Sequence, residues 1–434
     1  MNQGYDSAGD SHSRAKFDHM SSTACILEDS MNALDSIVSP TSTSQIGDAD
    51  HYFNLGLTLA SAKGVSKNFT KAFEAYMIAA QMQHKDAQRE VGLCYLKGLG
   101  VQADPALGIK WLRSSADQGS VQAMRDLGMC YQHGRGVESD SSAALELYAR
   151  AANAGYALAQ FDLGYCYYNG IGVAASASQA VYWFERSAEQ GIAEAQASLA
   201  HCLRKGIGIA RDPMKAIAWY EAAAKQGLRV AQYTLACIYF SGEGVEPNIK
   251  RAVKYLTRAA NGKYAKAQRD LGLCYQKGYG VPKSLDKALM FFLDAAAQNY
   301  SLAQFDLGYW YQNGIGVRQN FSEAVRWYRA AAEQGLANAQ HNLGYCYENG
   351  LGVEQNSKAA LEWYAAAAAQ GFPNSELAIG LRYEVGRDLP QSFALARQYY
   401  QRALDHGHAE AAEAIRRIDR IQTDESTKNH TEAL

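Results

Sequence analysis

The sequence predicts an all-α protein, a right-handed α/α solenoid of ten helix-turn-helix repeats closed by a C-terminal capping helix. The first observation is a small residue that recurs every 36 residues, at positions 56, 92, 128, 164, 200, 236, 272, 308, 344 and 380; it is Gly except at Ala200 and Ala236. The second is that each unit carries two apolar runs at helical spacing with a glycine-containing break between them. A repeat array also accommodates 434 residues without several separate cores.

The ninth repeat shows how each element is predicted. Leu343 and Tyr347 mark one face of a first helix around the small residue, which we call the reference position, and Trp363 belongs to the apolar face of a second helix. The break at 349–352 contains two glycines, which allow backbone conformations that other residues resist. Gly371 is expected to end the second helix. Small residues let the helices approach closely, and aromatic residues fill the layer between repeats.

The pattern AxAQxxLGxxYxxGxGV, followed by KA, WY and AAxQG, resembles the Sel1-like repeat (SLR) family, a relative of the tetratricopeptide α-solenoids. Tetratricopeptide repeats have a period of about 34 residues and a Trp four residues before the small residue. Here the period is 36 and that position is usually Gln. The resemblance covers residues 49 to 418 and implies a solenoid that binds other proteins.

Three segments are predicted along the chain. Residues 1–48 are polar and expected to be disordered, apart from a short helix at 25–38 that either packs on the first repeat, occupies the groove of the solenoid, or forms only transiently in the tail. Residues 49–418 form the solenoid, whose last part, after Gly407, is an amphipathic helix suited to cap the array. Residues 419–434 are expected to be a flexible polar tail.

Composition excludes several function classes. Forty-two Lys and Arg against 44 Asp and Glu give a net charge of −2, so we expect no nucleic-acid partner. The sequence has no apolar stretch near 18 residues and no apolar segment of a signal peptide at its start, so we expect no membrane insertion and a cytoplasmic location. Seven of the eight cysteines recur at nearly one place in each repeat, which predicts reduced, half-buried small hydrophobic residues.

The sequence shows no motif for catalysis or metal binding, and we expect no enzyme, no cofactor and no metal site. The GxG loops recur through the array and follow a helix, so they are predicted to be turns and not phosphate cradles. The histidines lack cysteines at zinc-ligand spacing. Some proteins resembling this pattern have been linked to β-lactam hydrolysis, but SxxK paired with SDN and KTG does not occur here.

The first helices of such arrays line the concave surface, where the variable positions are candidates for binding a partner. We expect an extended, partly acidic peptide or a helix there, with aromatic residues as anchors and cations that steer it. The candidates are Arg89, Arg125, Phe161, Tyr165, Tyr168, Asn169, Arg204, Tyr233, Arg269, Phe305, Tyr309, Asn313 and Tyr345. The alternative for Phe161 and Phe305 is packing against an adjacent helix.

A second periodicity lies within the first. AQFDLGYCYYNGIGV at Ala159 returns as AQFDLGYWYQNGIGV at Ala303, an offset of 144 residues, which is four repeats. Repeats 3 and 4 should therefore present nearly the same surface as repeats 7 and 8. Two such patches favour a partner with two related motifs or a dimeric partner.

These observations predict a non-enzymatic scaffold or adaptor that binds proteins or peptides along its first helices. One alternative is a regulatory subunit or activator of a partner enzyme in signalling, cell-wall synthesis or protein quality control. Another is a bacterial effector that is secreted by a dedicated system. A change in the catalytic rate of the bound partner would separate an activator from an adaptor.

Overall fold

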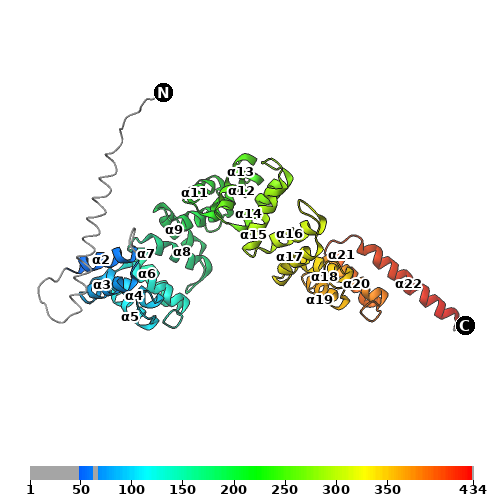
Figure 1. Ribbon diagram of the computed structural model, residues 1–434, viewed down its shortest axis with the longest axis horizontal. Helices are drawn as coiled ribbons and strands as arrows, with labels where there is room; N and C mark the ends of the chain where they lie inside the picture. Colours follow the sequence, from blue (N-terminus) through cyan, green and yellow to red (C-terminus); the bar gives the residue numbers. More distant parts are fainter. Residues whose placement is uncertain (1–47, 62–66, 433–434) are drawn as a thin grey trace, which may run out of the picture. The chain divides into compact units, whose positions relative to one another are not determined.

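The computed structural model describes residues 48–61 and 67–432, with side chains up to residue 423. Its regular structure within these ranges is helical throughout, in consecutive pairs of helices, which confirms the predicted all-α solenoid (Figure 1). The short helix predicted at 25–38 lies outside the described residues.

The helices alternate between the first and the second position of a repeat. The first helices are α2 (Ala49–Ser61), α4 (Lys85–Lys97), α6 (Val121–His133), α8 (Ala157–Asn169), α10 (Ala193–Lys205), α12 (Arg229–Ser241), α14 (Ala265–Lys277), α16 (Ser301–Asn313), α18 (Ala337–Asn349) and α20 (Pro373–Val385). The second helices are α3 (Phe69–Gln81), α5 (Pro105–Asp117), α7 (Ser141–Asn153), α9 (Ala177–Glu189), α11 (Pro213–Lys225), α13 (Ile249–Asn261), α15 (Leu285–Ala297), α17 (Phe321–Glu333), α19 (Ser357–Ala368) and α21 (Phe393–Asp405), and the final helix is α22 (Ala411–Glu432).

The chain divides into two compact units between Asp212 and Pro213, and each is described by itself. The first unit contains α2 to α10 and the second contains α11 to α22. Within each unit every helix packs against the next one along the chain (Figure 1). Repeats 3 and 4 lie wholly in the first unit and their counterparts, repeats 7 and 8, lie wholly in the second.

The GxG loop and the residue before each second helix set the turn within a repeat. In repeat 3, Gly134 ends α6 with a φ of 64°, and its N–H bonds to the Cys130 carbonyl. Only a residue without a side chain adopts this left-handed backbone at no steric cost. The Asp140 carboxylate then accepts hydrogen bonds from the N–H groups of Ser142 and Ala143, so it caps the start of α7. The loops are therefore turns between helices.

The reference glycine fixes the distance between the two helices of a repeat. A Cβ added to Gly308 would lie 2.5 Å from a ring carbon of Tyr328, and one added to Gly128 would lie 2.8 Å from the ring of Tyr148. Both tyrosines are fully buried. The ring therefore lies directly on the glycine backbone, which explains why this position is restricted to small residues.

The buried Gln four residues before the reference position joins three helices. In repeat 9, Gln340 Nε2 donates to the Ala332 carbonyl of the preceding repeat at 3.2 Å, and its Oε1 accepts from Gln370 Nε2 at 2.8 Å. Gln88, Gln160 and Gln304 make the same pair of bonds. A hydrogen-bonded amide therefore occupies the place where tetratricopeptide repeats carry an indole, and its donor and acceptor are both satisfied.

The C-terminal helix covers the last repeat. Helix α22 packs on α21, burying Ile415 and Ile418, and Arg417 bonds to the Glu384 carboxylate at 2.6 Å. This arrangement confirms the predicted cap. The helix continues to Glu432, past the boundary at 418 where the tail was expected to begin, because residues 419–432 contain no Gly or Pro that would end it.

Six of the cysteines are more buried than predicted. The thiols of Cys94, Cys130, Cys166, Cys202, Cys274 and Cys346 are buried, and no disulfide occurs among the described residues. Burial raises the pKa of each of these thiols to about 11. Cys237 lies one position nearer the reference residue and is exposed. The buried thiols pack as small apolar groups in the layer between helices.

Candidate partner-binding face

Three of the predicted cations are paired within the array. The Arg125 guanidinium donates to Asp162 of the next repeat at 2.5 Å, and Arg269 donates to Asp306 at 2.6 Å. Arg89 makes the same contact with Asp126. Burial raises the pKa of Asp162 and of Asp306, although the neighbouring guanidinium opposes this. The charges of these arginines are therefore compensated by the fold, and each pair joins one first helix to the next.

In repeat 6, Tyr233 occupies the position that Arg125 occupies in repeat 3. Its hydroxyl donates to Asp270 at 2.8 Å, and burial together with this carboxylate raises the pKa of the phenol. An aromatic side chain that we predicted as an anchor for a partner thus also links two repeats. Arg204 lies partly exposed on α10, and its carbonyl accepts from Arg211 Nε at 3.0 Å.

The two predicted phenylalanines contact the second helix of their own repeat. The ring centroid of Phe161 lies 5.9 Å from that of Phe184, and Phe305 lies 5.9 Å from Tyr328. Both side chains are half-buried. These contacts correspond to the packing role that the sequence left open, and they are the same in the two copies.

The two predicted asparagines bond to the helix they belong to. Asn169 Nδ2 donates to the Tyr165 carbonyl at 2.9 Å, and Asn313 Nδ2 donates to the Tyr309 carbonyl at 2.8 Å. Each satisfies one of the last carbonyls of its helix. The 144-residue duplication therefore preserves a helix end in both units.

Four of the five predicted tyrosines remain exposed, and three of them belong to a row of side chains that lie one residue after the reference position. Tyr165, Tyr309 and Tyr345, one residue after the reference position, are 47%, 48% and 44% exposed, and Tyr168 is 36% exposed. The other large apolar side chains of this row are Leu57 and Leu381, which are exposed, and Leu93, Met129 and Leu273, which are partly buried. Exposed aromatic side chains that recur at one position of an array are candidates for contact with a partner.

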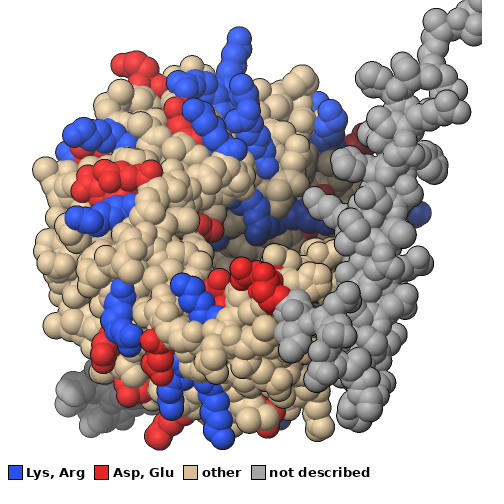
Figure 2. Space-filling view, turned by 90° about the vertical axis from the view of Figure 1, so that its left-hand side faces the viewer, with Lys and Arg blue, Asp and Glu red and all other residues tan. Residues whose placement is uncertain are grey.

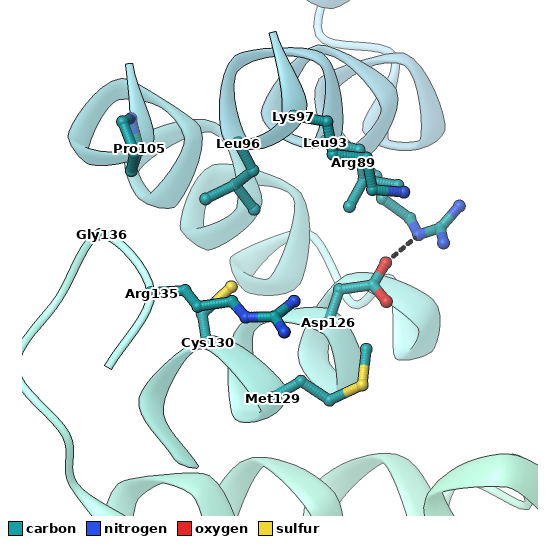
Figure 3. A pocket seen from close by; sticks show the side chains of 10 residues that line it. All are labelled: Arg89, Leu93, Leu96, Lys97, Pro105, Asp126, Met129, Cys130, Arg135 and Gly136. Atoms are coloured by element: carbon teal, nitrogen blue, oxygen red, sulfur yellow. Dashed lines mark hydrogen bonds and ion pairs between the residues drawn. The ribbon is translucent and has the colours of Figure 1, made fainter. Parts of the chain in front are cut away.

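A pocket lies between α4 and α6 in the first unit, where Leu93 and Met129 of the row line it (Figure 3). Its cavity volume is about 450 Å³, and it is lined by Arg89, Leu93, Leu96, Lys97, Pro105, Asp126, Met129, Cys130, Arg135 and Gly136. Sequence reasoning named Arg89 as a site residue and missed Leu96 and Arg135. The signal that could have found them is that both positions vary: Leu96 stands where repeats 3, 8, 9 and 10 have Gln or Glu, and Arg135 where repeats 2, 4, 8 and 9 have Leu or Ile.

The charges on the described surface are mixed. On the face that Figure 2 presents, Lys and Arg lie beside Asp and Glu at several places. Within residues 48–61 and 67–432 no cluster of His, Cys, Asp and Glu is suited to hold a metal ion. None of the helices described combines the length and the apolar character that crossing a membrane requires.

Comparisons with known proteins agree with this architecture. The Sel1 repeat model matches ten consecutive segments, from residues 52–84 to residues 373–408. A protective antigen of uropathogenic Escherichia coli strains that displays an SLR fold is 26% identical, over 91% of this chain and 90% of that one, with a TM-score of 0.57. A Sel1 repeat protein from Oxalobacter formigenes is 28% identical, over 79% and 97%, with a TM-score of 0.55.

A search of curated proteins gave no match. Solenoids of this type typically mediate protein–protein interactions, and they are generally non-catalytic. Because the ten matched segments span the array from residue 52 to residue 408, the chain belongs to the Sel1 repeat family.

Proposed function

We propose that this protein is a non-enzymatic adaptor that binds partner proteins along the exposed apolar row of its first helices. The observation that carries the proposal is the exposure of Tyr165, Tyr309 and Tyr345 at equivalent positions. Tyr combines a large apolar face with a hydroxyl at low entropic cost, which suits it to anchor a partner. The proposal includes a cytoplasmic location, in keeping with the buried, unpaired thiols.

The proposal rests on the exposed tyrosines more than on the other predicted site residues. A substitution at Arg125, Arg269, Phe161 or Phe305 would disturb the array as well as the binding of a partner, because each of these side chains contacts another helix of the chain. The tyrosines of the row are better probes because their rings face solvent. Tyr165 lies in the first unit and Tyr309 in the second, so each copy of the duplicated surface can be tested separately.

The test places the photo-crosslinking residue benzoylphenylalanine at position 165, at 309, or at 182 as a matched control. Tyr182 is 44% exposed but lies on α9, a second helix. We expect one partner to be crosslinked in cell extract from positions 165 and 309 and not from 182. Crosslinks from 182 alone, or the same proteins from all three positions, would exclude the row as the binding surface.

A further inference from the structure

Two residues that line the pocket between α4 and α6 differ from the residues at the same positions in several other repeats. The first is the residue between the two loop glycines. In repeats 2, 4, 8 and 9 this residue is Leu99, Ile171, Ile315 or Leu351, each partly buried against the apolar core. In repeat 3 it is Arg135, which is exposed. The apolar side chain that covers this place in repeats 2, 4, 8 and 9 is therefore missing in repeat 3.

The second departure is the residue four positions after the reference glycine. In repeats 3, 8, 9 and 10 it is Gln132, Gln312, Glu348 or Glu384, and each accepts a hydrogen bond from a tyrosine hydroxyl of the second helix. In repeat 2 these two places hold Leu96 and Leu112. Leu96 lies against Gly108, where an added Cβ would come within 2.8 Å of its Cγ. The wall of the pocket is thus apolar where repeats 3, 8, 9 and 10 carry a polar side chain.

The C-terminal repeats show which group Arg135 lacks. Arg387 occupies the same loop position in repeat 10, and its Nη1 lies 3.5 Å from the Glu348 carboxylate of repeat 9. The residue that corresponds to Glu348 beside Arg135 is Leu96. Figure 3 shows the Arg135 side chain reaching into the pocket, with Leu96 on one side and Met129 on the other. Arg135 therefore faces an apolar wall where its counterpart faces a carboxylate.

The charges around the pocket favour an anion. Arg89, Lys97 and Arg135 contribute three cations, and of these only Arg89 forms an ion pair with a described residue, through Asp126 and its neighbour Glu90. The acidic lining is Asp126 alone. A cavity of about 450 Å³ with apolar walls is large enough for a side chain and part of its neighbours.

We infer that this pocket receives a glutamate side chain of an extended partner peptide, whose carboxylate pairs with Arg135 while apolar neighbours contact Leu93, Leu96 and Met129. The partner thus supplies the carboxylate that Glu348 supplies within the chain in repeats 9 and 10. The inference rests on the proposed function and adds to it the chemical class of one recognised residue. Pairing in a partly enclosed, apolar site strengthens the contact.

The test measures binding of the full chain to a fluorescein-labelled, C-amidated Gly-Leu-Glu-Leu-Gly peptide by fluorescence polarisation. We expect the affinity to fall about tenfold for Arg135→Ile, and by a similar factor when the peptide Glu is replaced by Gln. The two losses should not add, because both remove one contact. Ile occupies this loop position in Ile171 and Ile315, so the variant is compatible with the fold, and Arg150→Ile on α7 removes the same charge elsewhere.

A second variant fills the pocket from within. Leu96→Glu places a carboxylate where Glu348 stands in repeat 9, and it should compete with the peptide and lower its affinity. Leu96→Gln has the same shape without the charge and should weaken binding less. Thermal unfolding of both variants checks that the repeat stays folded.

Three results would overturn the inference. These are no measurable binding of the Glu peptide to the wild-type chain, equal binding to wild type and Arg135→Ile, or equal binding of a Gln peptide that ends in a free carboxylate, which would assign the pocket to chain ends. None of them alters crosslinking at positions 165 and 309, so failure of the pocket is separable from failure of the adaptor proposal.

Discussion

Arg269 on α14 and Asp306 on α16 form an ion pair between consecutive first helices, with Nε and Oδ2 2.6 Å apart and side chains only 22% and 14% exposed. The same pair recurs 144 residues earlier as Arg125 and Asp162. The arginines that the sequence predicted as cations for a partner thus join the repeats to one another. The electrostatic attraction for a partner must come from other side chains.

Asp306→Ala should destabilise the second unit by about 1–3 kcal/mol, because it leaves the Arg269 guanidinium partly buried without its partner. The double variant Arg269→Met/Asp306→Ala should be less destabilised than the sum of the single variants. Urea unfolding followed by circular dichroism measures both. Asp294→Ala, at an exposed carboxylate of α15, is the control and should change stability by less than about 0.5 kcal/mol. Strict additivity at 269 and 306 would contradict the pair.

Gly308→Ala should destabilise the protein by about 1–3 kcal/mol, because the new methyl group would overlap the buried ring of Tyr328. Gly344→Ala is the matched comparison. Its Cβ would lie 3.0 Å from the nearest ring atom, against 2.5 Å at Gly308, so its cost should be smaller. Thermal unfolding gives the order, and an equal cost at both positions would show that the ring does not set the helix spacing.

Lys263→Gly should stabilise the protein by about 1 kcal/mol. Lys263 has a φ of 60° in the turn between two repeats, where most other repeats have Gly. Asn299 has the same φ, but its Oδ1 accepts from Gln304 and Gln334, so Asn299→Gly should bring no gain. Urea unfolding distinguishes the two variants, and a loss of stability in Lys263→Gly would refute the strain argument.

His341 should make stability fall as the solution is acidified. Burial lowers its pKa to about 4 from an unfolded value near 6.5, so the native state holds the neutral ring while the unfolded chain takes up a proton below 6.5. Stability is full above that pH and decreases towards pH 4, by about 2 kcal/mol between pH 7 and 5. His341→Phe, the residue type of Phe161 and Phe305 at this position, should lack that decrease. The same dependence of stability on pH in the wild type and in His341→Phe would contradict this prediction.

The repeat pattern was sufficient to predict the fold because spacing and residue size are visible in sequence. Gly344 and its equivalents fix where the helices touch, and the GxG loops fix where they turn. The extent of α22 was not predictable in this way, since a polar segment without Gly or Pro is compatible with either helix or tail. The hydrogen bond of Gln340 was not predictable either, because it depends on which backbone carbonyl lies beside the side chain.

The surface was predicted only in part, because the partners of a side chain lie in the next repeat. Arg125 and Tyr165 were both assigned to the exposed face from their spacing, yet Asp162 compensates the first while the second faces solvent. The pocket was not predicted, because no motif marks Leu96 or Arg135. Each only differs from the residue at the same position in some of the other repeats. Comparing each position across all ten repeats reveals such departures, whereas a search for binding motifs does not.

The buried thiols give the array a set of native reporters of its own opening. A thiol with a pKa near 11 inside the helix layer reacts with an alkylating reagent only when its repeat opens and exposes it. Cys94, Cys130, Cys166 and Cys202 span the first unit, and Cys274 and Cys346 belong to the second. Mass spectrometry of labelled peptides would therefore show, without any mutation, which repeat opens first when a partner binds or dissociates.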